Sequence, residues 1–276
     1  PCGLGLAHMD KVAIIGAGKI GEALISGMVA SGVDPRTIVA TNRSEERSAY
    51  LRETYGIEVE SDNRLAVADA DAVVLCVKPA QIVSVLEEIN DGLDEADDAA
   101  VIISMAAGIT LTAMEGAVAS AGAPIVRVMP NTPMLVGQGV LAVAYGRYVS
   151  DEQREGVRTM LGAAGKVVEV DEKQMDAVTA VSGSGPAYFF LLTEALIDAG
   201  VSLGLSRELA TELATATAAG AGSMLQANPD PVALRAGVSS PAGTTAAAIR
   251  EFEESGLRGA VYRAAEASAA RSAEIV

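Results

Sequence analysis

Short runs of apolar residues, many of them β-branched, alternate along the first 170 positions with segments whose apolar residues recur at helical spacing. Several runs lack polar alternation, which is typical of parallel strands covered on both faces. The expected strands are KVAIIGAG, TIVATN, IEVES, DAVVLCVKP, AAVIISMAAG, PIVRVMPNT, GVLAVAYG and KVVEVD. Helical segments such as SEERSAYLRETYG separate them. This alternation predicts an α/β fold with a Rossmann-type, doubly wound sheet.

After about Asp171 the strand signals stop and only helical patterns follow. Residues 186–204 start at Pro186, which suits a first helical turn, and their apolar content predicts a buried helix. Residues 206–226 are rich in Ala, Gly and Thr, whose small side chains let helix backbones approach closely. We therefore expect two domains that pack together, a sheet domain at 9–170 and an all-helical domain at 171–276.

The chain carries a formal charge of −16, from 36 acidic and 20 basic residues, and 50% of its residues are hydrophobic. Such a field repels nucleic acid and anionic membranes, so neither is expected as a partner. No uninterrupted apolar run reaches the roughly 20 residues that span a bilayer. We interpret the acidic excess as the solvated surface of a halophilic protein; an acidic protein that needs no salt is the alternative.

Residues 1–8 lack the charged start and long apolar core of a signal peptide, and we interpret them as an expression remnant before Met9. Without them the chain has one cysteine, Cys76, and no histidine. Hence no disulfide within one chain, no Cys/His zinc site and no Ser-His-Asp machinery is expected, and no metal site is predicted. Cytoplasmic residence is expected.

A glycine motif follows the first predicted strand and opens a helix. It consists of Gly16, Ala17, Gly18, Lys19, Ile20 and Gly21 and fits G-x-G-x-x-G. The first glycine permits a tight turn, the second lets a pyrophosphate approach the helix N-terminus, and the third allows close helix–strand packing. The motif therefore predicts a dinucleotide site; a glycine turn without a ligand is the alternative.

The end of the second predicted strand indicates which dinucleotide binds. An NAD site usually has an acidic residue there, whereas this chain has Asn42, Arg43 and Ser44. A guanidinium and neighbouring hydroxyls suit a 2′-phosphate, so we favour NADPH, with NADH possible. The alternative for Arg43 is a surface charge paired with Glu45 or Glu46.

Two further loops follow predicted strands, at the sheet edge where ligands bind. In CVKP, Lys78 either reaches cofactor phosphate or ribose or caps a turn, and Cys76 is interpreted as a small buried hydrophobe. In MPNTPM, Asn131 and Thr132 either place polar groups at the nicotinamide or belong to a structural turn. Far along the chain, VSSPAGTT at 238–245 gathers four hydroxyl side chains, and capping of the next helix is one explanation.

These motifs together resemble one family. GAGKIG, CVKPAQ, MPNTP, VSGSGPAY and SSPAGTT occur in the order and approximate spacing of pyrroline-5-carboxylate reductases, from about residue 11 to the C-terminus. The resemblance implies reduction of L-1-pyrroline-5-carboxylate, a cyclic imino acid, to L-proline with NAD(P)H, the last step of proline biosynthesis. It also implies that the helical domain binds substrate and interlocks into dimers, which in this family often assemble into decamers.

The resemblance also assigns residues to the site. The cofactor residues that it implies are Asn42, Arg43, Ser44 and Asn63 at the adenosine, and Val77, Lys78, Pro79 and the Met105–Ala107 turn with Ala106 at the nicotinamide. The substrate residues that it implies are Ser239, Ser240, Gly243, Thr244 and Thr245, with the Thr245 hydroxyl near the imine nitrogen. Gly237 departs from the larger residue common in relatives, so a side-chain contact from that position is absent.

This arrangement needs no strong acid or base, because the cofactor supplies the hydride and the protein supplies orientation and electrostatics. Thr245 is the predicted catalytic residue, holding the imine N–H as the nitrogen becomes an amine. The helix that follows the loop points N–H groups at it, which favours the substrate carboxylate. Glu194 either accepts from the substrate nitrogen or is an exposed, ion-paired residue.

Two other functions remain open from the sequence. A different NADP-dependent imine or hydroxyacid oxidoreductase can share this organisation, but the hydroxyacid enzymes generally need a lysine on the helix after the sheet domain. Here the last lysine, Lys173, precedes GSGP. A non-catalytic dinucleotide-sensing protein explains the glycine motif but not a loop suited to a small carboxylate.

Overall fold

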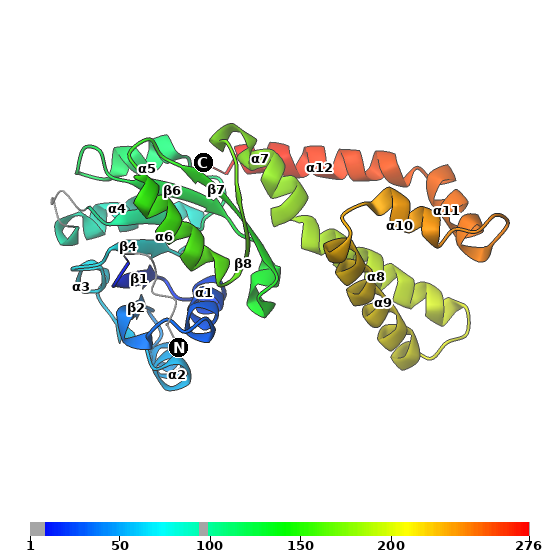
Figure 1. The fold of residues 1–276 in the computed structure, drawn as a ribbon, viewed down its shortest axis with the longest axis horizontal. Coiled ribbons are helices and arrows are strands. Elements are labelled where there is room, and N and C mark those ends of the chain that lie inside the picture. The colour runs from blue at the N-terminus through cyan, green and yellow to red at the C-terminus, as the bar shows by residue number, and fades with distance from the viewer. Residues whose placement is uncertain (1–8, 94–98, 276) are drawn as a thin grey trace. The chain divides into compact units, whose positions relative to one another are not determined.

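The computed structural model describes residues 9–93 and 99–275, so the residues interpreted as an expression remnant lie outside the described part. The chain forms two compact units (Figure 1). The first comprises Pro1–Gly183 together with Ser268–Val276, and the second comprises Ser184–Ala267.

The first unit is built on one eight-stranded sheet with the order β3-β2-β1-β4-β5-β6-β7-β8. Its strands are β1 (Val12–Ile15), β2 (Ile38–Thr41), β3 (Glu58–Glu60), β4 (Ala72–Leu75), β5 (Val101–Ser104), β6 (Ile125–Met129), β7 (Gly139–Tyr145) and β8 (Gly165–Glu169). All eight predicted strands are present, and the predicted doubly wound, Rossmann-type sheet is confirmed. The order reverses between β1 and β4, which is the point where such sheets bind ligands.

The sheet is mixed rather than fully parallel. β7 runs antiparallel to β6, whereas β8 is parallel to β7. The short connection between β6 and β7, residues 130–138, contains only the 3₁₀ turn η4 (Thr132–Val136). A parallel neighbour needs a crossover of a dozen or more residues, usually a helix, so this length forces an antiparallel return.

Helices cover both faces of the sheet (Figure 1). They are α1 (Lys19–Ala30), α2 (Glu45–Tyr55), α3 (Asn63–Val67), α4 (Ile82–Ile89), α5 (Leu111–Ala117) and α6 (Asp151–Gly162). Successive strand residues point to opposite faces, and each face has its own core. Ile14 packs in one with Leu24 and Met28 of α1, and Ile15 in the other with Leu86 of α4.

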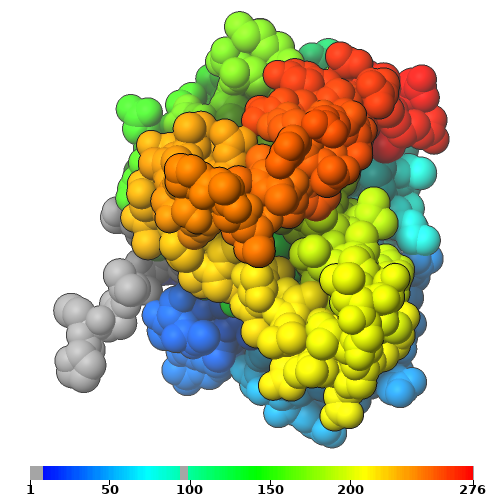
Figure 2. All heavy atoms as spheres, turned by 90° about the vertical axis from the view of Figure 1, so that its right-hand side faces the viewer, coloured from blue at the N-terminus to red at the C-terminus, as the bar shows by residue number. Residues whose placement is uncertain are grey.

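The second unit is all-helical. It contains α8 (Gly185–Ser202), α9 (Arg207–Ala227), α10 (Pro231–Gly237), α11 (Thr244–Glu254) and most of α12 (Leu257–Ala273). Helices α8 and α9 pack closely, because a Cβ on Gly200 would lie 3.2 Å from the Cβ of Ala210. Figure 2 shows the surface of these helices, coloured from yellow-green to red.

The prediction of a buried helix at 186–204 is wrong for the single chain. Within α8, Gly185 is the buried residue, whereas Phe189, Phe190 and Leu191 are at least 65% exposed. By length and composition alone, the helical stretch Glu172–Ser202 can cross a membrane, with a mean hydropathy of 1.2. This test averages hydropathy over a window and therefore tolerates a few polar residues. The sequence analysis considered uninterrupted apolar runs, and Thr193 and Glu194 interrupt the run here.

The segments nearest to the domain boundary pack with the sheet unit. Helix α7 (Met175–Val178) and the π-helical turn η6 (Thr179–Gly183) lie in the first unit, and so does the end of α12. The Ser272 hydroxyl of α12 donates to Asp176 of α7 at 2.8 Å. The compact units therefore divide at Gly183, while the boundary expected at residues 170/171 stays a prediction about the functional domains.

Candidate active site

The glycine motif forms a turn that only glycine fits well. Gly16 has a φ of +79°, and a Cβ there would lie 2.5 Å from Cγ1 of Val77 after β4. A Cβ on Gly21 would lie 3.2 Å from Cγ2 of Ile14, so α1 packs directly on β1. Around Gly18 the nearest atom to a built Cβ is 3.9 Å away, which leaves room above the helix N-terminus.

The end of β2 fixes this turn from the side. The Gly16 N–H donates to the Thr41 hydroxyl at 3.0 Å, and the Ala17 N–H donates to the Thr41 carbonyl at 2.8 Å. Within the described residues no side chain caps the N-terminus of α1, whose cap residue is Gly18. Helix α1 thus offers free N–H groups and the positive end of its dipole, which suits a pyrophosphate. The residues present fit a dinucleotide.

The segment after β2 is arranged around the same turn. Nδ2 of Asn42 donates to the Ala17 carbonyl at 3.0 Å, and Oδ1 of Asn42 accepts the Ser44 N–H at 2.9 Å. The Ser44 hydroxyl caps α2 by accepting the Arg47 N–H at 3.3 Å. The Arg43 side chain is exposed and has no ion pair among the described residues.

The surface-pairing alternative for Arg43 loses one of its partners, because Glu45 pairs with Arg52 at 2.9 Å. An exposed guanidinium beside the end of β2 is therefore available to a 2′-phosphate.

A half-buried charge cluster joins α1 to α2 beside the glycine turn, and the sequence interpretation missed it. The Glu22 carboxylate accepts from Arg47, from the Tyr50 hydroxyl and from the Tyr55 hydroxyl, the last two at 2.9 Å. Burial alone would raise the pKa of Glu22, but these hydrogen bonds outweigh it and lower that pKa. Burial, followed by the Glu22 contact, raises the pKa of Tyr55 to about 12.

Arg47 in this cluster is itself close to the cofactor turn. Its guanidinium lies 5.0 Å from the Tyr50 ring centroid and donates to the Gly18 carbonyl at 3.5 Å. No sequence motif marks Glu22, Arg47, Tyr50 and Tyr55, because these residues meet only when α1 and α2 pack side by side.

The loops after β4 and β5 lie across the switch point from β2. Lys78 is exposed and starts the 3₁₀ turn η2 (Pro79–Gln81) without a side-chain capping bond. Cys76 is half-buried rather than fully buried as expected, and desolvation raises the pKa of its thiol to about 12. Asn63, at the start of α3, donates to the Glu88 carboxylate at 3.2 Å.

The turn after β5 is largely buried. The Met105 N–H donates to the Leu75 carbonyl at 3.0 Å, and the Ala106 N–H donates to the Ser104 hydroxyl at 3.3 Å. The backbone that follows reverses at Gly108, where φ is +83°. Val77, Lys78, Pro79 and Ala106 therefore share the carboxyl edge of the sheet with the glycine turn.

The MPNTPM loop has a structural role in the described contacts. Asn131 is 8% exposed, and its Nδ2 donates to the Ser182 carbonyl at 3.1 Å. Its Oδ1 accepts the Val140 N–H at 2.8 Å. Because both ends of the amide are engaged, Asn131 ties the loop to β7 and to the π-helical turn.

The hydroxyl-rich loop belongs to the second unit and precedes α11. The Ser239 hydroxyl donates to the Arg235 carbonyl at 2.7 Å, at the end of α10. Ala242 has a φ of +59°, and the Gly243 N–H donates to the Ser240 carbonyl at 3.0 Å. Gly243 is the cap residue of α11 and makes no side-chain capping bond.

These contacts count against a purely capping role for the loop. Among the described residues, the hydroxyls of Ser240, Thr244 and Thr245 make no hydrogen bond, although Thr245 is half-buried. The N–H groups at the start of α11 are left open to an anion. Glu194 is exposed on α8, and a Cβ on Gly237 would meet no atom within 4 Å.

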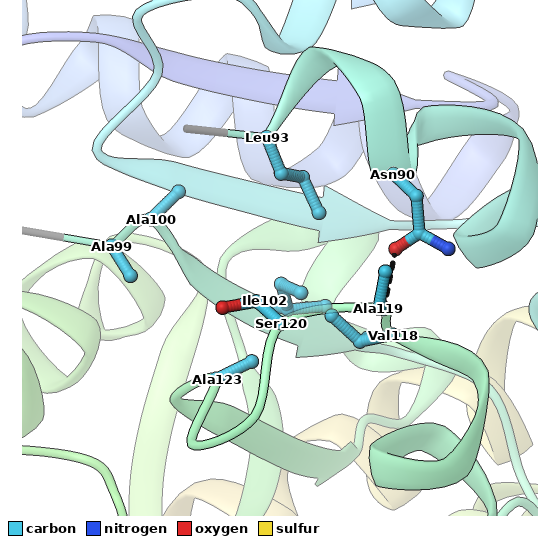
Figure 3. A pocket seen from close by; sticks show the side chains of 9 residues that line it. All are labelled: Asn90, Leu93, Ala99, Ala100, Ile102, Val118, Ala119, Ser120 and Ala123. Carbon is cyan, nitrogen blue, oxygen red and sulfur yellow. Dashed lines mark hydrogen bonds between the residues drawn. The ribbon is translucent and has the colours of Figure 1, made fainter. Parts of the chain in front are cut away.

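The pocket in Figure 3 lies at the other end of β5, beside its first residues. Its lining is mainly alanine and aliphatic, and the Asn90 Oδ1 accepts the Ala119 N–H at 2.9 Å. The amino ends of the strands are not where doubly wound sheets bind ligands, so this pocket is distinct from the candidate site.

The sheet, its switch point and the open glycine turn define a dinucleotide-dependent oxidoreductase of the Rossmann type with an appended helical region. Two family models match the chain. Residues 11–108 match an NADP oxidoreductase domain described as coenzyme F420-dependent, and residues 172–275 match pyrroline-5-carboxylate reductase dimerisation.

Full-length relatives are more specific. The chain is 58% identical over 268 residues to the pyrroline-5-carboxylate reductase of Corynebacterium melassecola, covering 97% of this chain and 99% of that protein. The chain belongs to the pyrroline-5-carboxylate reductase family.

Solved structures agree with this assignment. A pyrroline-5-carboxylate reductase from Coxiella burnetii superimposes with a TM-score of 0.91 at 37% identity, covering 97% of this chain and 99% of that one. The Plasmodium falciparum pyrroline carboxylate reductase, solved with NADP bound, has a TM-score of 0.84 at 32% identity and covers 98% and 99%. The resemblance inferred from the motifs is confirmed, and the protein is an oxidoreductase.

Proposed function

We propose that the protein reduces L-1-pyrroline-5-carboxylate to L-proline with NADPH, the last step of proline biosynthesis. The observation that carries the proposal is the 58% identity to a pyrroline-5-carboxylate reductase over nearly the whole length of both chains. Hydroxyacid dehydrogenases with the same fold are much more distant, at 15% identity for a 3-hydroxyisobutyrate dehydrogenase, and that likeness concerns the fold alone.

The first unit would hold the cofactor. NADPH supplies a hydride when it is bound. The pyrophosphate would lie over the open N-terminus of α1, because Gly18 leaves room there and no side chain of the described residues caps that helix. Arg43 and Ser44 would contact the 2′-phosphate, and Asn63 the adenosine. Val77, Lys78, Pro79 and Ala106 would contact the nicotinamide half. NADH would also serve as a hydride donor. It lacks only the 2′-phosphate and would keep the contacts that the site makes with the rest of the dinucleotide.

The loop Ser239–Thr245 would hold the substrate. Ser239, Ser240, Gly243 and Thr244 would bind the carboxylate, which the open N-terminus of α11 favours. The imine would enter protonated, so that hydride addition gives the neutral amine, and the Thr245 hydroxyl would accept from the N–H of the imine and stabilise the amine that forms. Orientation of the ring in this way accounts for catalysis without a histidine or a buried acid.

We infer that the protein self-associates through its helical unit and that dimers are the basic assembly. The exposed apolar side chains of α8 support this, and so does the match of residues 172–275 to a dimerisation model. Burial in a partner would also explain the membrane-like hydropathy of Glu172–Ser202. Further assembly into decamers, and the lack of nucleic-acid and membrane partners, stay predictions.

We also propose a cytoplasmic, salt-tolerant enzyme, on the strength of its cysteine usage and its formal charge of −16. The excess of carboxylates would be screened by salt, so activity and melting temperature should hold or rise in molar KCl. A melting temperature that falls steadily between 0.1 M and about 2 M KCl would contradict the halophilic interpretation.

The central experiment follows NADPH oxidation with pyrroline-5-carboxylate as substrate, for the wild type and for Thr245→Ala. We expect turnover to fall roughly tenfold to a hundredfold in the variant, with NADPH affinity nearly unchanged. Thr245→Ser keeps a hydroxyl and should retain most activity, and Thr211→Ala, an exposed threonine of α9, should behave as wild type. Unchanged turnover in Thr245→Ala removes Thr245 from the mechanism, and a wild type inactive on this substrate removes the proposed function.

A further inference from the structure

The loop between β5 and α5 packs against the C-terminal residues of the chain. Gly108, in this loop, packs against Ile275: a Cβ on Gly108 would lie 2.4 Å from the Ile275 carbonyl oxygen and 2.9 Å from both its Cβ and its Cγ2, the last of which Ile275→Ala removes. With a φ of +83°, Gly108 also has a backbone that other residues adopt only with strain. The contact therefore depends on the absence of a side chain in the loop.

Ile275 is held in place by the last turn of α12. The Ser272 side chain, which is 2% exposed, donates to Asp176 of α7 at 2.8 Å. The Ile275 N–H then donates to the Ser272 carbonyl at 3.2 Å. All of these residues belong to the first compact unit, so the tail and the loop form one packed arrangement.

A second contact holds the other end of the same loop. Oε1 of Glu172 accepts the Leu111 N–H at 2.7 Å and Nη1 of Arg127 at 3.1 Å. The Arg127 side chain is 7% exposed and lies on β6, where its partner on β5 is Ser104. A charge-assisted hydrogen bond of this kind, here half-buried, is stronger than one between neutral groups and so restrains the Leu111 backbone. Thus Glu172 and Ile275 act on the two ends of the segment Met105–Leu111.

This loop has a functional position. It leaves the carboxyl end of β5, next to β4 and across the switch point from the adenosine side at β2. A dinucleotide that crosses the switch point places its second half over β4 and β5. The inference therefore rests on the proposed cofactor site, and it concerns the backbone that would contact the nicotinamide half.

We propose that Ile275 and Glu172 are positioning residues that hold the loop Met105–Leu111 against the nicotinamide half of NADPH. Their contacts are with the loop, and neither residue would need to touch the cofactor. They act through the loop backbone, since Gly108 contributes no side chain and Leu111 is held by its N–H. A loop held in its binding conformation loses less entropy when the cofactor binds.

The test compares two ligands of the intact protein, NADPH and 2′,5′-ADP, which is the adenosine half without the nicotinamide. In Ile275→Ala we expect the dissociation constant of NADPH to rise about tenfold, while that of 2′,5′-ADP stays within about twofold of wild type. A merely structural role would move both constants together or neither. Glu172→Gln should act in the same direction, because the amide keeps an acceptor but loses the ion pair with Arg127.

A matched control lies on the same tail. Glu274 forms an exposed ion pair with Arg271 at 2.9 Å, and among the described residues it makes no hydrogen bond or ion pair with the loop. Glu274→Gln should leave both dissociation constants unchanged, and Ile275→Leu should restore most of the NADPH affinity. The melting temperature of each variant shows that the protein is folded at the assay temperature.

Two results would overturn the proposal: equal weakening of both ligands in Ile275→Ala, or NADPH affinity unchanged in Ile275→Ala. The binding comparison needs no imine substrate, so it remains informative if the wild type fails to reduce pyrroline-5-carboxylate. Conversely, an active wild type with unchanged Ile275→Ala binding leaves the proposed function intact and removes only the positioning role.

Discussion

The two compact units differ in how far their large apolar side chains are buried. In the sheet unit, Ile14 and Ile15 are completely buried on opposite faces of β1. In the helical unit, Phe189, Leu192 and Leu196 are exposed, and their spacing of three and four positions places them on one face of α8. Contiguous apolar surface of this kind on a folded chain marks an interaction site. The sheet unit thus completes its core within one chain, whereas the helical unit does not.

A pocket among the last helices shows the same character. It has a volume of about 430 Å³ and is lined largely by Phe252, Leu257, Val261 and Tyr262, with Arg258 at its edge. Arg258 pairs with Glu253 at 2.8 Å and so leaves the apolar walls uncovered. At roughly 25 cal/mol per Å² of apolar surface buried, covering such walls stabilises an assembly appreciably. The difference between the units therefore predicts which substitutions affect assembly and which affect cofactor binding.

The largest effect is expected from charges on α8. In the double variant Phe189→Asp, Leu196→Asp, the changed residues lie seven positions apart and hence on one helix face. Burying two carboxylates in an interface should weaken self-association by about 4 kcal/mol or more, so the mass in solution should fall to that of one chain. Analytical ultracentrifugation measures this change, and NADPH affinity should remain close to that of wild type.

The matched control places the same charge on the sheet unit. Leu65 of α3 is 63% exposed, nearly the same as Phe189, yet it lies on a unit with its own core. Leu65→Asp should leave the solution mass unchanged. If Leu65→Asp dissociates the protein and the α8 variant does not, the contrast between the units is wrong.

The next largest effect is expected at the glycine turn. Gly16→Ala combines a positive φ with a Cβ 2.5 Å from Val77, so the turn must shift. We expect the dissociation constant of NADPH to rise roughly a hundredfold, about 3 kcal/mol, in a calorimetric titration, with the solution mass unchanged. Gly32→Ala has a similar φ of +93° but no atom within 4 Å, and should bind NADPH normally.

A smaller effect on stability is expected at the α1–α2 cluster. Glu22→Gln weakens three hydrogen bonds to a carboxylate and should lower the free energy of unfolding by about 2 kcal/mol at pH 7. Because the folded state lowers the pKa of Glu22 below its usual 4.5, this stabilisation is present above pH 4.5. It is lost as pH falls through the folded pKa.

Urea unfolding at several pH values checks the Glu22 prediction. The difference between wild type and Glu22→Gln should be constant from pH 6 to pH 8 and should shrink in acid below about pH 4. Glu53→Gln, on the exposed side of α2, provides the control and should show little difference at any pH. A Glu22 difference that grows in acid would contradict the assignment.

The smallest effect is expected at Arg43. Arg43→Ala removes a charge proposed to contact the 2′-phosphate, so the KM for NADPH should rise about tenfold, or about 1.4 kcal/mol, while that for NADH stays unchanged. Arg36→Ala is the control, since Arg36 is exposed and pairs with Asp34 at 2.6 Å. An equal rise in KM for NADPH and for NADH would show that Arg43 does not contact the 2′-phosphate.

Much of the sheet unit could be predicted from local pattern. Most strands are apolar runs, although β3 is not, and the first glycine of the turn, Gly16, has a φ of +79° that only glycine adopts easily. The predicted burial of the helix at 186–204 was wrong for the single chain, because apolar content predicts that a helix is covered but does not say whether the same chain covers it. Asn131 could be found but not interpreted, because its partners Val140 and Ser182 are nine and 51 positions away.

The sequence by itself determined the order of strands and helices, the dinucleotide turn and the family, because these depend on local spacing and on motifs that tolerate little change. Only the tertiary structure decided that Glu22 gathers Arg47, Tyr50 and Tyr55, and that Ile275 packs on Gly108. Such contacts join segments far apart in the chain. They arise when packing brings side chains within a few ångströms, and no local spacing encodes that distance.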